Sequence, residues 1–264
     1  MIENIKYRIG RYITGRLTYQ FSNFKPNSAG SYSMRNQATE YNVKNLVKGL
    51  SKVSTYFNSP EIILSQDLDI DNDYAKLIAE TFNKYGSDKS SIHNYEIVYA
   101  YILNKLSKNI EMLEIGLGSN NTKIISNMGK DGSPGSSLKA FSELLPDSNI
   151  YGADIDKDIL FSSQNIECFF IDQTKYESYI ELENKINKKL DLIIDDGLHT
   201  QSTNLNSLFF ALNNLNLNGY LLIEDIPEYA IETWLIVFNI IKDNFECEIV
   251  KTKHFYVFIL KKIS

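Results

Sequence analysis

Acidic residues gather after two apolar segments of this 264-residue chain, and a histidine accompanies one of the two groups. They are, in chain order, Asp195, Asp196, His199, Glu224 and Asp225. Carboxylates at one point repel each other and raise one another's pKa unless a cation neutralises them. Mg²⁺ is the natural cation, because it prefers carboxylate and water oxygens and keeps positions open for a substrate. The pattern indicates a magnesium site, with helix capping or cofactor binding as the alternative role for some of these acids.

The histidine of this group has the right chemistry for a general base. His199 lies three residues beyond Asp196, at the turn that begins the next predicted helix. An imidazole can accept a proton from an alcohol whose acidity a metal has increased. The chain has three histidines, so a base in this cleft has few competitors. We predict this role for His199, with a structural role as the alternative, and expect His254 in an exposed turn.

Two glycines mark a second element of a binding site. Gly116 and Gly118 belong to the motif Glu-Ile-Gly-Leu-Gly at residues 114–118. Glycine lets the backbone approach a ligand without an intervening Cβ atom. A dinucleotide fingerprint needs a third glycine three residues later, and that position is Asn121. The loop at residues 119–134 is also longer than a nicotinamide site requires, so the motif favours another nucleoside cofactor.

Two further acids end predicted strands in the same region. Asp154 is well placed to accept hydrogen bonds from both hydroxyls of a ribose, and Asp172 and Gln173 could meet an adenine amino group. A turn or helix-cap role is the alternative for each acid. A polar cluster at residues 85–95 could fold over the cofactor as a lid, or could be a plain loop between helices.

Strands and helices alternate from residue 110 onward, which predicts a parallel sheet with right-handed crossovers. The predicted strands cover residues 111–115, 149–153, 166–171, 190–195, 219–224, 246–250 and 255–260. The predicted helices cover residues 71–85, 94–108, 136–145, 176–189, 202–215 and 229–243. The pattern fits an α/β fold with a doubly wound, seven-stranded Rossmann-like sheet whose last strand is antiparallel. In such sheets ligands bind at the carboxyl ends of the strands, where the acids stand.

The first 70 residues differ from the rest in charge. Residues 1–60 carry nine Lys and Arg against two acids, whereas the remaining chain carries 18 bases and 31 acids. We expect residues 1–70 to form a helical extension and residues 71–264 to form the sheet domain. We consider three roles for this extension. It could pack on its own core or on a second subunit, it could help to recognise an anionic substrate, or it could lie on a membrane surface. Apolar residues at helical spacing, namely Ile2, Ile5, Ile9, Ile13 and Leu17, form an apolar stripe that must be buried, so we expect a homodimer or a higher oligomer.

Composition excludes several other classes. No segment reaches the roughly 18 apolar residues of a transmembrane span, and the first ten residues lack the apolar core of a signal peptide. Two cysteines give no disulfide framework, and we expect both to be buried and reduced. The acidic sheet domain would repel nucleic acid. We therefore expect a cytoplasmic protein.

Together these motifs resemble the class I methyltransferases that include the mycinamicin and macrocin sugar O-methyltransferases. The resemblance covers roughly residues 80–226. Its most specific part is Asp-Asp-Gly-x-His at residues 195–199, combined with the long loop that contains Pro134 and Gly135. Related sequences also look like capsule and surface-glycan methyltransferases.

The resemblance implies an S-adenosylmethionine-dependent, magnesium-assisted O-methyltransferase that acts on a hydroxyl of a sugar, a glycan precursor or its phosphoryl decoration. It implies Asp196, Glu224 and Asp225 as metal ligands, and His199 with Asp196 as the catalytic pair. The expected cofactor contacts are Tyr85, Ser87, Lys89, Glu114, Gly116, Gly118, Asp154, Ile155, Asp172, Gln173 and Asp195.

Two alternatives to an active sugar methyltransferase stay open. The chain could be a silent subunit that supports a partner methyltransferase, although its intact acids and histidine argue against this reading. A nicotinamide-dependent sugar oxidoreductase would need the missing third glycine. Within the methyltransferase class, N-methylation of a small amine would need no metal.

Overall fold

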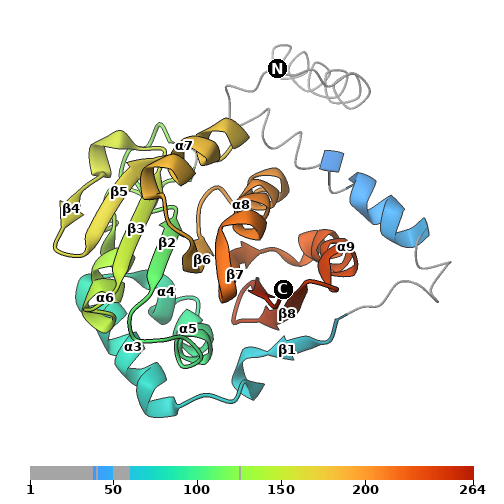
Figure 1. Cartoon of the computed structure of the whole chain (residues 1–264), viewed down its shortest axis with the longest axis horizontal. Helices are drawn as coiled ribbons and strands as arrows, with labels where there is room; N and C mark the ends of the chain where they lie inside the picture. The colour runs from blue at the N-terminus through green and yellow to red at the C-terminus, as the bar shows by residue number, and fades with distance from the viewer. Residues whose placement is uncertain (1–37, 40, 50–59, 125) are drawn as a thin grey trace, which may run out of the picture.

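The computed structural model describes residues 38–39, 41–49, 60–124 and 126–264 (Figure 1). Residues 41–49, which lie within the expected extension, are helical. The basic segment with its apolar stripe lies outside the described residues, so the extension and its role stay predictions. In the described part of the chain, no helix is both long enough and apolar enough to cross a membrane.

The described residues form one mixed sheet of nine strands, in the order β1-β8-β9-β7-β6-β2-β3-β5-β4. The strands are β1 (Ile62–Leu64), β2 (Glu111–Ile115), β3 (Asn149–Asp154), β4 (Ser162–Ser163), β5 (Ile166–Phe170), β6 (Leu190–Asp195), β7 (Leu215–Ile226), β8 (Phe245–Lys251) and β9 (Tyr256–Lys262). The seven predicted strands are all present, and β9 runs antiparallel to both of its neighbours, β7 and β8.

The expected number of seven strands is wrong, because each edge of the sheet carries one more short strand. β1 pairs in parallel with β8, and β4 pairs in antiparallel fashion with β5. β1 has three residues and β4 has two, too few to show a recognisable alternation of apolar and polar residues. Gln164, with a φ of 37°, reverses the chain between β4 and β5. β1 also shows that part of the expected extension joins the sheet.

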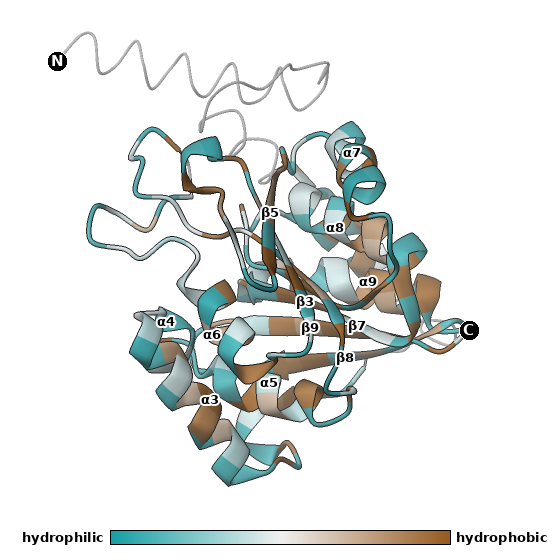
Figure 2. Ribbon diagram, turned by 60° about the vertical axis from the view of Figure 1, so that its left-hand side comes forward, coloured by the Kyte–Doolittle hydropathy of each residue, from teal (hydrophilic) through white to brown (hydrophobic). Residues whose placement is uncertain are grey.

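Helices cover both faces of the sheet (Figure 2). One group packs with the core cluster around Met112 and the other with the cluster around Leu113. The first group is α3 (Asn72–Tyr85), α4 (Asp88–Ser91), α5 (Tyr95–Leu103) and α6 (Ser136–Leu144); the second is α7 (Tyr176–Ile186), α8 (Gln201–Asn214) and α9 (Ile231–Ile241). Short 3-10 helices are η2 (Ser65–Asp67), η3 (Lys157–Ile159) and η4 (Glu228–Ala230). The two faces correspond to a doubly wound α/β fold.

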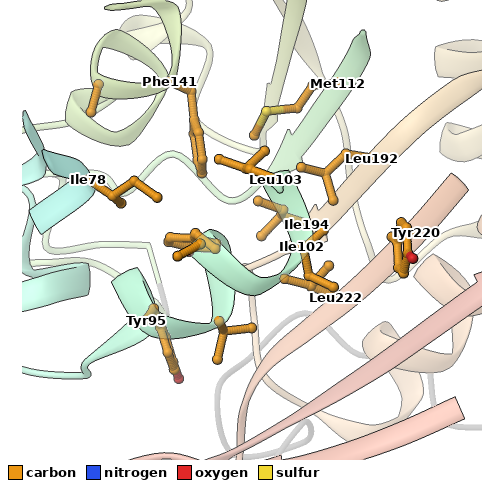
Figure 3. Packing of buried hydrophobic residues seen from close by; sticks show 14 of the residues in the cluster. Ile78, Tyr95, Ile102, Leu103, Met112, Phe141, Leu192, Ile194, Tyr220 and Leu222 are labelled. Carbon is orange, nitrogen blue, oxygen red and sulfur yellow. The ribbon is translucent and has the colours of Figure 1, made fainter. Parts of the chain in front are cut away.

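The alternation of side chains along each strand decides which face a residue joins. Met112, Leu192 and Leu222 pack with Phe141 and Ile78 on the α3–α6 face (Figure 3). The same alternation places Glu114 and Glu224, each two residues beyond Met112 or Leu222, on this face. Two carboxylates are thereby buried beneath the helices of this side.

Helix ends follow local backbone chemistry more closely than apolar periodicity. α7 stops at Ile186, three residues before the predicted end, because Asn187 adopts a left-handed conformation with a φ of 49°. Asparagine is one of the residues that commonly ends helices in this way. The two cysteines are free and only half-buried, so the expectation that both are buried is wrong.

Candidate active site

A cavity of about 480 Å³ opens at the carboxyl ends of the central strands. This volume is within the usual range of sites that bind small molecules or cofactors. Gly116, Gly118, Asp154, Asp196 and Asp225 all line it, so motifs that are distant in the sequence meet here. The expected convergence at this edge of the sheet is present.

The glycine loop makes its turn where no side chain fits. Gly116 has a φ of 94° and Gly118 a φ of 75°, a conformation that L residues other than glycine seldom adopt. A Cβ atom on Gly116 would lie 2.2 Å from the backbone oxygen of Asp196. The loop therefore packs directly against the Asp-Asp-Gly-Leu-His segment, and glycine joins these two parts of the cavity wall.

We expect Gly116→Ala to destabilise the protein by roughly 3 kcal/mol or more, because backbone strain and an overpacked contact add together. Gly129→Ala is the matched control: Gly129 has a φ of 76°, and a Cβ atom there would meet nothing within 4 Å. It should cost about 1 kcal/mol, from backbone strain alone. Urea unfolding of both variants measures the difference, and equal losses would contradict the close packing.

Asp154 is held by the backbone and faces the cavity. Its Oδ2 accepts a hydrogen bond from the amide of Leu117 at 2.8 Å, and its Oδ1 accepts one from the amide of Asp156 at 2.8 Å. Burial raises the pKa of the Asp154 carboxyl, while these amide hydrogen bonds oppose the shift. The neighbouring Ile155 lines the same wall and is largely exposed. Both residues line the cavity, and the ribose contact of Asp154 stays a prediction.

Asp172 and Gln173 form the next part of the wall, and both line the cavity. The Lys175 ammonium, 2.7 Å from Asp172 Oδ2, lowers the pKa of Asp172 against the effect of burial. Gln173 Nε2 donates to Asp195 Oδ1 at 2.8 Å, and Gln173 Oε1 accepts from the amide of Leu198 at 2.8 Å. Gln173, which follows β5, thus connects the end of that strand to the Asp-Asp-Gly-Leu-His segment at residues 195–199.

Lys89 lies at the centre of the acidic groups. Its side chain is 5% exposed, and its Nζ is 2.6 Å from Asp196 Oδ2, 2.6 Å from Glu224 Oε2 and 3.4 Å from Glu114 Oε1. The pKa of Lys89 is well above its ordinary value because the attraction of these carboxylates exceeds the lowering effect of burial. Buried charges of this kind are tolerated when they are paired.

Glu224 is fully buried and has partners at both oxygens. In addition to Lys89 at Oε2, the hydroxyl of Tyr99 donates to Oε1. Burial raises the pKa of Glu224 to about 8, although Lys89 acts in the opposite direction. Tyr99 reaches this carboxylate from α5, one helical turn after Tyr95. The expected metal ligand Glu224 therefore stands in an inner position, held by a lysine and a tyrosine.

Asp196, His199 and Asp225 form an outer group that faces the cavity. One ligand atom from each of the three lies within 4.8 Å of the others. His199 Nε2 is 3.9 Å from Asp196 Oδ1 and 3.6 Å from Asp225 Oδ2. Tyr95 donates a 2.5 Å hydrogen bond to Asp225 Oδ1, and His93 Nδ1 is 3.6 Å from the same oxygen. Two carboxylates and an imidazole at this spacing fit a divalent cation.

Both His199 and Asp225 adopt left-handed backbone conformations, with φ values of 52° and 54°. Residues other than glycine adopt this conformation at an energetic cost, and such residues cluster at functional sites. The surrounding contacts hold the two side chains against this cost. Backbone strain at two residues whose side chains lie 3.6 Å apart favours a functional role for the outer group.

Three of the expected cofactor contacts lie outside the cavity wall. Tyr85 donates to Glu143 on α6 at 2.7 Å. Glu114 lies beneath the wall, where its Oε2 accepts from Ser137 at 2.7 Å. Asp195 is buried behind the wall, where Gln173 and Asn204 donate to its two oxygens. These placements do not support direct cofactor contacts, whereas the others of the set, including Ser87 and Lys89, line the cavity.

Sequence reasoning missed the loop that closes one side of the cavity. Lys123, Ile124, Ser126, Asn127 and Met128 line the cavity from this loop. The hydroxyl of Ser126 donates to the Gly197 backbone oxygen at 3.1 Å, so the loop reaches across to the acidic turn. The unusual length of this loop was the feature of the sequence that could have indicated its place at the cavity.

No family model matches the chain. A curated relative, the 8-demethyl-8-alpha-L-rhamnosyl tetracenomycin-C 2'-O-methyltransferase of Streptomyces olivaceus, is 24% identical over 144 residues. This match covers 54% of the chain and 36% of the relative. The chain therefore spans about a third of the length of this relative.

Solved structures of the MycE methyltransferase from the mycinamycin biosynthetic pathway, in complex with Mg and SAH, are also similar. One matches with a TM-score of 0.58 and 20% identity, over 70% of this chain and 54% of that chain. A complex that also contains mycinamycin VI matches with a TM-score of 0.58 and 18% identity, over the same shares of the two chains. The chain has the methyltransferase fold. The predicted resemblance to sugar O-methyltransferases is confirmed.

Proposed function

We propose that the chain is an S-adenosylmethionine-dependent, magnesium-assisted O-methyltransferase that acts on a sugar hydroxyl. The observation that carries the proposal is the meeting of two sites in one cavity. The glycine loop and Asp154 line the same cavity as the outer group of Asp196, His199 and Asp225. A methyl donor bound at the first set and an acceptor hydroxyl bound at the second would share this cavity.

Different residues would bind different parts of the methyl donor. Asp154 would accept hydrogen bonds from the ribose hydroxyls, and Asp172 with Gln173 would contact the adenine. Gly116 and Gly118 allow the backbone to approach the donor closely. The loop that contains Met128 would exclude water from the donor, because it folds against Gly118 and lines the cavity.

The outer group would bind and prepare the acceptor. When bound, Mg²⁺ would increase the acidity of the acceptor hydroxyl. Asp196 and Asp225 would hold the cation, with Glu224 behind them. His199 would accept the hydroxyl proton at Nε2, the nitrogen that faces both carboxylates. Holding donor and acceptor in line would supply much of the rate enhancement.

We further propose a bacterial capsule or surface-glycan precursor, or its phosphoryl decoration, as the acceptor class. The support is the sequence resemblance to glycan methyltransferases, together with a relative that methylates a rhamnosyl group. A cytoplasmic location and a homodimer or higher oligomer, with a partner methyltransferase as the alternative assembly, belong to the same proposal.

A methyl-transfer assay tests the proposed reaction. Purified protein would be incubated with radiolabelled S-adenosylmethionine and a panel of nucleotide sugars, sugar phosphates and small amines, with Mg²⁺ or with EDTA. We expect label to enter a sugar with Mg²⁺ and little label with EDTA. Transfer that is equal in EDTA would exclude the metal role, and label in amines alone would indicate N-methylation.

A further inference from the structure

Lys89 lies on α4, beside the sheet, and forms ion pairs with carboxylates near the ends of three neighbouring strands. Its carboxylate partners come from β2 (Glu114), from the turn after β6 (Asp196) and from β7 (Glu224). These strands are adjacent in the order β7-β6-β2. Three carboxylates lie within 3.4 Å of the Lys89 ammonium group, and the lysine side chain is 5% exposed. The carboxylates therefore form a buried cation site that Lys89 itself fills.

The lysine and the outer group share one carboxylate. Asp196 Oδ2 binds Lys89 at 2.6 Å, while Asp196 Oδ1 faces His199 at 3.9 Å. A divalent ion held by Asp196 and Asp225 would therefore lie across a single carboxylate from a fixed positive charge. Like charges at such separations repel, and the burial of Lys89, whose side chain is 5% exposed, makes the repulsion stronger than in bulk water.

We propose that Lys89 is a built-in competitor of the divalent cation, and that its charge keeps the metal affinity of the free protein low. This inference rests on the proposed metal role and assigns to Lys89 a function beyond cofactor contact. Lys89 already forms ion pairs with Asp196 and Glu224 on the buried side of the site. An incoming ion must therefore share these carboxylates with the ammonium group. Metal binding then gains from any further negative charge that a bound acceptor brings.

The test is calorimetric or paramagnetic titration of Mn²⁺ into the apo protein, without methyl donor or acceptor. Lys89→Met should tighten Mn²⁺ binding by roughly tenfold or more, because the repulsion by a nearby unit charge is removed. Lys84→Met is the matched control: Lys84 is an exposed lysine of α3, paired with Glu143 at 2.6 Å. Its affinity for Mn²⁺ should equal that of the wild type.

A second pair of variants covers the case in which Lys89→Met does not fold. Glu114→Gln removes a carboxylate that contacts Lys89 and does not line the cavity, so it should weaken Mn²⁺ binding. The double variant Lys89→Met/Glu114→Gln removes one charge of each sign and preserves the buried balance. It should bind Mn²⁺ more tightly than Glu114→Gln alone, and Mn²⁺ should raise its Tm more than that of the wild type.

The outcomes separate the two claims. Binding of Mn²⁺ by the wild type, with equal or weaker binding after loss of Lys89 in both backgrounds, would overturn the competitor role and leave the proposed metal site intact. It would show that Lys89 only organises the carboxylates. No Mn²⁺ binding by any variant would overturn the metal site and the inference together, while methyl-donor binding would stand on its own test.

Discussion

Asp196→Asn should abolish most methyl transfer while the protein still binds S-adenosylhomocysteine. Asp196 is the carboxylate that serves both Lys89 and the outer group. Its replacement by the isosteric amide removes a negative charge from the metal-binding atoms without leaving a cavity. Loss of a metal ligand costs several kcal/mol of transition-state stabilisation, which corresponds to a fall in kcat of roughly 100-fold to 1,000-fold.

Rates and calorimetric affinities together check this result. The affinity for S-adenosylhomocysteine should stay within about twofold, since the proposed donor contacts Asp154, Asp172 and Gln173 are other residues of the cavity lining. Asp147→Asn is the control, because Asp147 is an exposed aspartate in the turn between α6 and β3. A wild-type rate for Asp196→Asn would show that the acidic group is not the reaction centre.

His199→Asn should lower kcat by roughly 100-fold to 10,000-fold, the usual contribution of a general base. Asparagine is the suitable replacement, because His199 has a φ of 52° and asparagine adopts left-handed conformations more readily than alanine. Initial rates with saturating S-adenosylmethionine and Mg²⁺ measure this loss.

Metal affinity distinguishes the base from a metal ligand at this position. His199 Nε2 lies close enough to Asp196 and Asp225 to join a ligand set. If His199→Asn retains Mn²⁺ affinity and loses the rate, the residue acts as the base. A tenfold or greater loss of Mn²⁺ affinity would instead place His199 among the ligands, and an unchanged rate would exclude both roles.

The sheet and the convergence of its acids could be predicted because each depends on local patterns. Short apolar runs that alternate with helical patterns predicted the seven main strands. Asp154, Asp196 and Asp225 then follow from a general rule, since the carboxyl ends of parallel strands meet at one edge. Asp154 ends β3, Asp196 directly follows β6 and Asp225 is the penultimate residue of β7, which leaves little freedom in where they lie.

The internal partners of the acids could not be predicted, because they depend on contacts between distant segments. Lys89 and Glu224 are 135 residues apart, and no local pattern indicates that a lysine of α4 is buried among carboxylates. Likewise, Asp195 at the end of β6 accepts hydrogen bonds from Gln173 and Asn204 behind the cavity wall. A carboxylate after a strand can face the ligand or support the wall behind it, and side-chain packing decides between the two.

The assignment depends most directly on binding of the methyl donor. Calorimetric titration of S-adenosylhomocysteine into the purified protein, once with Mg²⁺ and once with EDTA, measures this binding separately from the acceptor. We predict micromolar affinity in both conditions, because the proposed donor contacts, Asp154 and the glycine loop, are not among the residues that would hold the cation. Absence of binding in both conditions would contradict the methyltransferase assignment, and binding of NADH in its place would support the oxidoreductase alternative.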